Sequence, residues 1–286
     1  MAATIIAAVS HPFADLALAR RLELAEAHAN VAFVEARARL MPESGAAWME
    51  AAGARAMFDG VASPLTQTFG LGMSGAVSAD ELTRIERFFS DRGAPAYHEV
   101  SPLADASVLA LFQDRGYQPF EFTSVLCRPI DRELRIAPAP AAGLRVRTIG
   151  RNEVSLWGET ASGGWSETPE LASFIEALAA VVLDSRDVAC FVAELDGHPI
   201  ATGAMSLSGG VALLAGASTI PSGRRRGAQL ALLETRLRHA AAHGCDLAMM
   251  CAAPGSASQR NAERQGFRVA YTRIKWRLPP ARSGSA

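Results

Sequence analysis

The hydrophobic positions of the second half of the chain predict a mixed sheet with helices on both faces. Alternating positions indicate strands, and positions three or four residues apart indicate helices. The expected elements are a strand at 144–149, helices at 153–161 and 169–183, strands at 190–195, 200–207 and 211–220, a helix that ends at Gly244, a strand at 247–251, a short helix and a strand at 269–272. The turn Asp196-Gly197 joins the first two of the three successive strands as a hairpin.

The first half repeats the end of that order. Its expected elements are a helix at 80–91, a strand at 96–100, a short helix that ends at Arg115 and a strand at 120–128. The same elements in the same order favour an internal duplication. Alternating Ala and Pro between the halves predict an extended linker. We therefore expect an α/β (α+β) protein with domains at 1–135 and 144–286 and a linker at 136–143.

Composition argues against several classes of function. The 286 residues carry a formal net charge of −1, so no electrostatic argument favours nucleic acid or an anionic membrane as a partner. No apolar run approaches the ~20 residues that span a bilayer, and the N-terminus lacks the features of a signal peptide. Cys127, Cys190, Cys245 and Cys251 have no Cys-x-x-Cys spacing, so we expect free thiols, no metal site and a cytoplasmic protein.

A glycine- and arginine-rich turn separates the strand at 211–220 from the long helix. Its sequence is Arg224-Arg225-Arg226-Gly227-Ala228. The first N–H groups of a helix have no partner within the helix, and the helix dipole places partial positive charge there. Three arginines add charge, and small residues let the backbone approach a ligand closely. The turn therefore predicts a pyrophosphate site built from main-chain atoms, with a solvated basic turn or a site for another phosphate ligand as alternatives.

This order of elements and this turn resemble the GNAT acyltransferase superfamily. In that family an Arg/Gln-x-x-Gly-x-Gly/Ala signature after the fourth strand holds the pyrophosphate of coenzyme A. Arg224-x-x-Gly227-x matches the signature, with Gln229 where the family prefers Gly or Ala. Pro221 and the closing Gly266-Phe267 also resemble family features. The resemblance covers about residues 145–280.

The first half resembles the same fold without the binding turn. The corresponding segment, 70–81, contains glycines but no basic residue, and Asp80 and Glu81 at its end would repel an anion. The whole chain thus resembles a tandem GNAT protein with a degenerate N-terminal copy. Each GNAT-like domain would have a mixed, mostly antiparallel sheet flanked by helices on both faces.

The resemblance implies that acetyl-CoA, or another acyl-CoA, is the cofactor. The binding residues that it implies are Thr219, Ile220, Arg224, Arg225, Arg226, Gly227, Ala228, Gln229, Leu230, Ser258 and Asn261. In the family a bulge in strand four splays it from strand five and turns a backbone N–H toward the acyl oxygen. By register from Arg224, this donor is at Thr219 or Ile220.

The groups that would transfer protons are less well defined. Many family members carry a Tyr as general acid four residues before the terminal Gly, where this chain has Ala262. The strand at 211–220 has no carboxylate, so the candidate general bases are Glu159 and Glu167, on either side of the loop where the family builds its acceptor site.

Two tryptophans flank the same loop. Trp157 and Trp165 are candidates for the walls of an apolar acceptor pocket. The alternative is that both tryptophans belong to the core and that the two nearby carboxylates are surface charges.

The sequence therefore favours an N-acyltransferase, with an amine acceptor that attacks acetyl-CoA directly in a ternary complex. The acceptor would be a small molecule or a peptide, and the protein a monomer or homodimer. A chain from about residue 140 onward would keep cofactor binding if the second domain alone carries it. The alternative is a non-catalytic coenzyme A-binding sensor or interaction module that has lost its proton-transfer groups.

Overall fold

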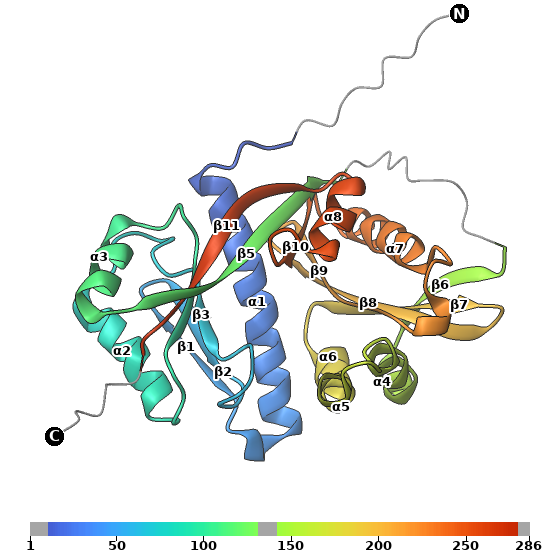
Figure 1. The fold of residues 1–286 in the computed structure, drawn as a ribbon, viewed down its shortest axis with the longest axis horizontal. Helices are drawn as coiled ribbons and strands as arrows, with labels where there is room; N and C mark the ends of the chain where they lie inside the picture. Colours follow the sequence, from blue (N-terminus) through green and yellow to red (C-terminus); the bar gives the residue numbers. More distant parts are fainter. Residues whose placement is uncertain (1–10, 131–141, 280–286) are drawn as a thin grey trace, which may run out of the picture.

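The computed structural model describes residues 11–130 and 142–279, so most of the linker expected at 136–143 lies outside the described residues. The described chain forms one sheet of eleven strands in the order β1-β2-β3-β4-β11-β5-β10-β9-β8-β7-β6 (Figure 1). The mixed α/β architecture with helices on both faces is confirmed.

The first half begins with a long helix. Its helices and strands are α1 (Leu16–Leu40), β1 (Ala47–Ala51), β2 (Ala54–Phe58), β3 (Gln67–Phe69), α2 (Ala79–Ser90), β4 (Tyr97–Val100), α3 (Ala106–Arg115) and β5 (Gln118–Pro129). The predicted order from α2 to β5 is confirmed. The sequence analysis did not include α1.

The second half also follows the predicted order. Its helices and strands are β6 (Leu144–Ile149), α4 (Val154–Gly163), α5 (Pro169–Ala177), α6 (Ala179–Asp184), β7 (Val188–Leu195), β8 (His198–Ser208), β9 (Val211–Thr219), α7 (Ala228–Ala242), β10 (Leu247–Ala252), α8 (Ala257–Arg264) and β11 (Arg268–Arg277). One predicted helix, at 169–183, is two helices that meet at Leu178. In Figure 1, α7 and α8 cover one face of the second-half strands, and α4, α5 and α6 cover the other.

The two halves exchange their last strands. β5, from the first half, pairs with β10 and β11 of the second half. β11, from the second half, pairs with β4 and β5 of the first half. The sheet therefore continues through the boundary between the halves, and each half supplies a strand that the other half encloses.

Helix α1 crosses this junction. Its residues Leu18 and Leu22 pack into one core with Val125 of β5, Val211 of β9 and Met249 of β10. Helix α1 also packs against β1, β2 and β3 of the first half. The burial of these apolar side chains holds the two halves together.

A buried arginine lies beneath α1. Arg273 of β11 is fully buried, and its guanidinium lies 2.6 Å from the Glu26 carboxylate and 3.6 Å from that of Glu99. Glu23 accepts a hydrogen bond of 2.8 Å from the Tyr271 hydroxyl. Burial raises the pKa of Glu23 to about 7, against the opposing effect of Arg273. These polar groups link α1 to the exchanged strand β11.

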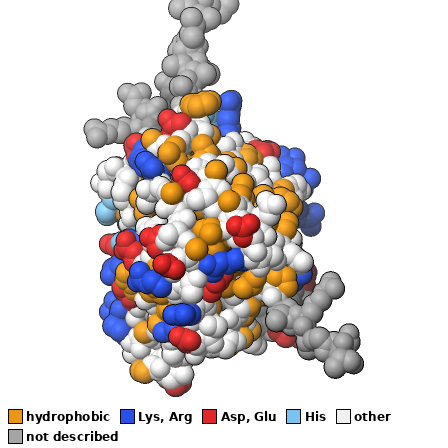
Figure 2. All heavy atoms as spheres, turned by 90° about the vertical axis from the view of Figure 1, so that its left-hand side faces the viewer, with side chains coloured by type: hydrophobic (Ala, Val, Ile, Leu, Met, Phe, Trp, Pro, Cys, Tyr) orange, Lys and Arg blue, Asp and Glu red, His pale blue; other side chains and the backbone are white. Residues whose placement is uncertain are grey.

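The surface is mixed in character. Figure 2 shows acidic, basic and apolar side chains interspersed over the outer face of the first half. None of the helices within the described residues is both long and apolar enough to cross a membrane. All four cysteines are free thiols, with Cys127, Cys190 and Cys245 buried and Cys251 half-buried.

Candidate functional site

Strands β9 and β10 separate in the middle of the second half. They pair in parallel only between Val211–Leu213 and Leu247–Met249. Beyond these residues β10 continues to pair with β5, while β9 continues to pair with β8. The two parallel strands therefore open into a gap, as the resemblance predicted for strands four and five.

A bulge in β9 accompanies this separation. In the β8–β9 pair, Thr202 lies opposite Ser218 and Ala204 lies opposite Ala215. The bulged strand thus places two residues, Gly216 and Ala217, against a single residue of β8. Gly216 has a φ of 60°, which glycine adopts without the strain that other residues incur. A bulge bends its strand, which accounts for the divergence of β9 from β10.

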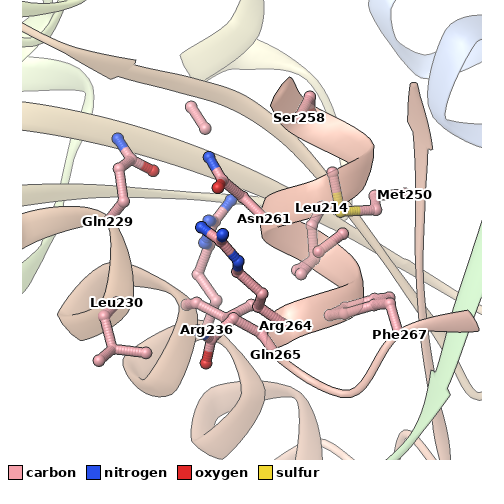
Figure 3. Close-up of a pocket in the computed structure, with 13 residues that line it drawn as sticks. Leu214, Gln229, Leu230, Arg236, Met250, Ser258, Asn261, Arg264, Gln265 and Phe267 are labelled. Carbon is pink, nitrogen blue, oxygen red and sulfur yellow. The ribbon is translucent and has the colours of Figure 1, made fainter. Parts of the chain in front are cut away.

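The gap contains a cavity of about 490 Å³, which we call the gap cavity (Figure 3). Leu214 and Met250 line it from the two diverging strands. Four residues that the sequence analysis assigned to cofactor binding also line it: Gln229 and Leu230 from α7, and Ser258 and Asn261 from α8. These residues come from separate segments of the chain, and the fold brings them to one cavity.

The start of α7 is open to solvent. Arg224, Arg225, Arg226 and Gly227 are all exposed, and Gly227 is the N-cap, with a φ of 81° and no capping side chain. The Arg224 N–H donates to the Pro221 carbonyl and the Ala231 N–H to that of Gly227. For the amides of 225–230, which lie between them, the structure records no acceptor among the described residues. We call residues 224–230 the cradle.

Similarity to known proteins agrees with this geometry. Residues 131–254 match the family model described as an acetyltransferase (GNAT) domain. The chain carries a GNAT domain. The sequence has no significant match among curated proteins.

Solved structures share the fold of most of the chain. A GCN5-related N-acetyltransferase from Kribbella flavida has 20% identity and a TM-score of 0.60, over 88% of this chain and 97% of that one. A tandem GNAT protein from the clavulanic acid biosynthesis pathway has 15% identity and a TM-score of 0.56, over 80% of this chain and 79% of that one. The tandem GNAT arrangement that the sequence suggested is therefore confirmed at the level of the fold.

The structure distinguishes the two candidate oxyanion donors of the GNAT domain. The Ile220 N–H donates to the Ile200 carbonyl at 3.0 Å, so this amide is already engaged within the sheet, and Ile220 is corrected as a candidate. In an antiparallel pair, hydrogen-bonded and non-hydrogen-bonded positions alternate. Thr219 is the next position along β9, opposite Ala201. By this alternation its N–H points away from β8.

Gln229, the departure from the family signature, turns back toward β9. Its Nε2 donates to the Ser218 carbonyl at 2.9 Å and to the Thr219 hydroxyl at 2.7 Å. These bonds tie the first turn of α7 to the end of β9. The Gln229 side chain, larger than the Gly or Ala of the family signature, is thereby directed toward β9 rather than across the turn.

The two candidate bases are both exposed but differ in position. Glu167 lines a cavity of about 400 Å³ together with Thr219 and Arg224, and we call it the loop cavity. The Glu167 carboxylate pairs with the Arg224 guanidinium at 3.2 Å. Glu159 lies on the exposed side of α4 and is absent from the described residues that line these two cavities.

The two tryptophans do not line one common pocket. Trp165 is 42% exposed and lines the loop cavity. Trp157 is 3% exposed and packs in a core cluster with Ala161, Ala179, Cys190 and Ala204. The indoles separate because Trp157 lies on the inner face of α4, whereas Trp165 follows the end of that helix. The alternative interpretation, a core residue, holds for Trp157.

Arg236 is a residue of the site that the sequence analysis missed. It is 4% exposed, and its Nη1 donates to the carbonyls of Ala204 and Ala215, at 3.2 and 3.3 Å, on both strands beside the bulge. Burial lowers the pKa of Arg236 to about 10. Gly203 makes room for it, since a Cβ there would lie 3.1 Å from the guanidinium carbon. Arg236 therefore supports the bulge and lines the gap cavity.

A sequence signal for Arg236 did exist. It lies four residues after Leu232 and four before Ala240, which are both fully buried. Residues four apart share one face of a helix. This spacing places Arg236 on the buried face of α7.

Proposed function

We propose that the protein is an N-acyltransferase that transfers an acyl group, acetyl in the simplest case, from coenzyme A to an amine. The observation that supports this proposal most strongly is the combination of an exposed helix start with unpartnered amides and a gap between two parallel strands. Phosphate oxygens need several N–H donors and positive charge. The cradle offers both, and the gap cavity adjoins it through Gln229 and Leu230.

Each residue set has a distinct part in binding. The cradle amides and Arg224, Arg225 and Arg226 would hold the pyrophosphate. Ser258 and Asn261 would contact the pantetheine arm in the gap cavity. The bound thioester supplies an activated acyl group. The Thr219 N–H would donate to the acyl oxygen, where negative charge develops during the reaction.

The reaction balances without a further reactant. The amine nitrogen, after losing one proton, attacks the thioester carbonyl carbon, a C–N bond forms and the C–S bond breaks. The amine nitrogen loses a second proton as the amide forms. One proton ends on the departing sulfur and one in solvent, so an ammonium and an acyl thioester give an amide, a thiol and a proton. Glu167, beside Thr219 in the loop cavity, is the better placed of the two candidate bases.

A coenzyme A-binding sensor is the second candidate function. Two observations favour it. Ala262, at the position of the family's general acid, has no proton to give, and the Glu167 carboxylate is paired with Arg224. A sensor would bind the cofactor in the same cradle without acylating any acceptor.

The test combines binding and turnover. Acetyl-CoA is titrated calorimetrically into the full chain, and thiol release is then followed with a panel of primary amines. Gly227→Val should abolish binding, because a branched side chain at the N-cap blocks the approach of phosphate to the amides. Gly244→Val is the matched control, since Gly244 lies at the other end of α7 with a similar φ of 79° and an open surrounding.

Three outcomes are distinct. Binding lost in Gly227→Val and kept in Gly244→Val, with thiol release on at least one amine, supports the enzyme. Saturable binding without turnover on any amine supports the sensor. Unchanged affinity in Gly227→Val refutes the cradle, and with it both functions.

A further inference from the structure

A second apolar cavity lies behind the β9 bulge. It measures about 220 Å³ and is lined by Leu213 and Gly216 of β9. Leu214, the residue after Leu213, lines the gap cavity instead. Successive residues of a strand point to opposite faces of the sheet. The two cavities therefore lie on opposite faces of the sheet beside the bulge.

The first half of the chain supplies one wall of this cavity. Ala29 and Phe33 of α1 line it opposite Trp157 of α4. Figure 1 shows α1 running between the first-half strands and the second-half helices α4 to α6. We call this space the α1 cavity. Its wall is complete only when both halves are present.

The chemistry of the lining is neutral. The described residues that line the α1 cavity include no Asp, Glu, Lys, Arg or His. The loop cavity, by contrast, contains Glu167 and Arg224. An ammonium or a polycation needs carboxylates to offset the cost of losing water. The α1 cavity therefore suits an apolar group and not a charged one.

Its size is that of a ring or a short branched chain. A dry cavity of ~150 Å³ accommodates one benzene ring, and the α1 cavity is somewhat larger. Two lining residues, Trp157 and Ser206, also have buried polar atoms, Nε1 and Oγ, with no hydrogen-bond partner among the described residues. Buried polar atoms are normally paired, so these two can serve a polar atom of an occupant beside its apolar body.

From this position and this chemistry we infer that the α1 cavity receives the apolar body of the acceptor amine. The inference rests on the proposed function. The gap cavity on one face takes the thioester, and the nucleophile arrives from the opposite face beside the bulge. The acceptor class is thus a primary amine with a small aromatic or branched aliphatic body. Helix α1 of the first half determines this preference.

The test narrows the cavity from the α1 side. Ala29→Leu adds three carbons to the lining, and leucine is a good helix former. The matched control is Ala17→Leu, the same substitution at an exposed position of α1. The acceptors are phenethylamine, with an apolar body, and 2-aminoethanol, with a polar one. Thermal midpoints and the Kd of acetyl-CoA are measured for each variant to show that folding and cofactor binding persist.

With acetyl-CoA, we expect Ala29→Leu to lower kcat/KM for phenethylamine by at least about tenfold, or about 1.4 kcal/mol. It should leave 2-aminoethanol within about twofold of the unmodified chain, and Ala17→Leu should change neither. The cavity assignment is wrong if kcat/KM for phenethylamine is unchanged, or if kcat/KM falls equally for both amines while the Kd of acetyl-CoA is unchanged. Either result leaves the proposed acyltransferase function intact.

Two further measurements separate the remaining possibilities. Replacing acetyl-CoA by hexanoyl-CoA tests the acyl chain: a selective loss of hexanoyl transfer in Ala29→Leu would place that chain in the cavity and overturn the assignment to the acceptor. Direct calorimetric binding of phenethylamine does not require turnover. If no amine is acylated but phenethylamine binds and Ala29→Leu weakens it, the proposed function fails and the cavity assignment survives.

Discussion

Both halves of the chain place a helix between the two strands of a parallel pair, and the two helices begin differently. In the first half α2 connects β3 with β4, and in the second half α7 connects β9 with β10. The start of α2 is closed by its own residues. Ser78 Oγ accepts from the Glu81 N–H at 3.3 Å, and Glu81 Oε2 accepts from the Ser78 N–H at 2.9 Å.

The segment that leads into α2 is also closed. Residues 70–73 are buried, and the Gly72 carbonyl accepts a hydrogen bond of 2.9 Å from the Asp105 N–H, just before α3. A Cβ at Gly72 would lie 2.6 Å from Val108 of α3, which shows how closely this segment packs. The equivalent segment before α7 is exposed at residues 224–227.

This difference separates a helix start that the chain itself closes from one that stays open. The N–H groups of a helix start need acceptors, and a capping box supplies them from within the chain. Where the cap is a glycine and the first turn has no acid, the same groups are left for a ligand. The sheet is shared by the two halves, so the fold alone does not decide which helix start is open.

The largest effect is expected from removing the first half. A chain that starts at residue 140 lacks β5, so β10 and β11 lose the strand that lies between them. We expect this fragment to unfold and to lose acetyl-CoA binding, even where the second half alone contacts the cofactor. Circular dichroism and calorimetry on the purified fragment check this.

The control is a chain that is cleaved between the two halves but keeps both of them. A protease site inserted between residues 135 and 140 allows the full chain to be cleaved while β5 and β11 remain present. The two pieces should elute together in size exclusion and bind acetyl-CoA with unchanged affinity. A folded, binding-competent fragment from residue 140 would instead show that the exchanged strands are dispensable.

The next largest effect is expected from the basic residues that distinguish the α7 start from the α2 start. Replacing Arg224, Arg225 and Arg226 together by alanine should raise the Kd of acetyl-CoA roughly 100-fold at low salt, from about 1 kcal/mol for each exposed charge. The effect should shrink as salt is added, because exposed charges are screened.

The control for these arginines removes the same charge from the other helix. The residues to replace by alanine are Arg84 and Arg87 in α2 and Arg92 just after it, all exposed. Calorimetric titration should give an unchanged Kd. An equal loss of affinity in both triple variants would mean that net charge, and not the cradle, governs binding.

The helix starts also show what sequence reasoning can reach. The residues that distinguish the two helix starts are local signals, because a cap and the residues it serves lie within one turn. They are Ser78, Asp80 and Glu81 at the start of α2, and Arg224, Arg225, Arg226 and Gly227 before α7. The sequence therefore predicted that the two helix starts differ, and the structure shows one capped start and one open start. The same locality explains why the elements from α2 onward were predicted in the right order.

Features that depend on distant pairing were not predicted. No local pattern in β5 or β11 indicates which half each strand joins, because both strands read as ordinary alternating segments. Trp157 and Trp165 lie close in sequence but on opposite sides of a helix end, so spacing alone placed them together. The role of α1 at the junction depends on contacts with β9 and β10, more than 150 residues away.

A smaller effect is expected from giving α7 one of the acids that α2 carries. Gln229→Glu adds a negative charge in the first turn, close to the expected pyrophosphate, and should weaken acetyl-CoA binding by roughly two- to tenfold. It also removes the Nε2 donor to Ser218 and Thr219. Gln229→Leu removes the donor without the charge and serves as the control. If the two variants have the same Kd, the loss of affinity comes from the missing hydrogen bonds to β9 and not from the added charge.

The smallest effect on binding is expected from opening α2. Ser78→Ala removes the cap of that helix and should lower the free energy of unfolding by about 1 kcal/mol with no change in the Kd of acetyl-CoA. Hydrogen bonds from the Ser78 backbone N–H and, secondly, from its hydroxyl hold the pKa of Glu81 below its ordinary value of 4.5, and Ser78→Ala removes only the second. Because the folded pKa is lowered, the stabilisation that comes with it is present above about pH 4.5 and is lost as the pH falls through the folded value. Denaturant unfolding at pH 7 and near pH 3 should therefore show a larger difference between Ser78→Ala and the unmodified chain at pH 7. An altered Kd would mean that the closed helix start of the first half acts on the open one of the second, through the sheet that the two halves share.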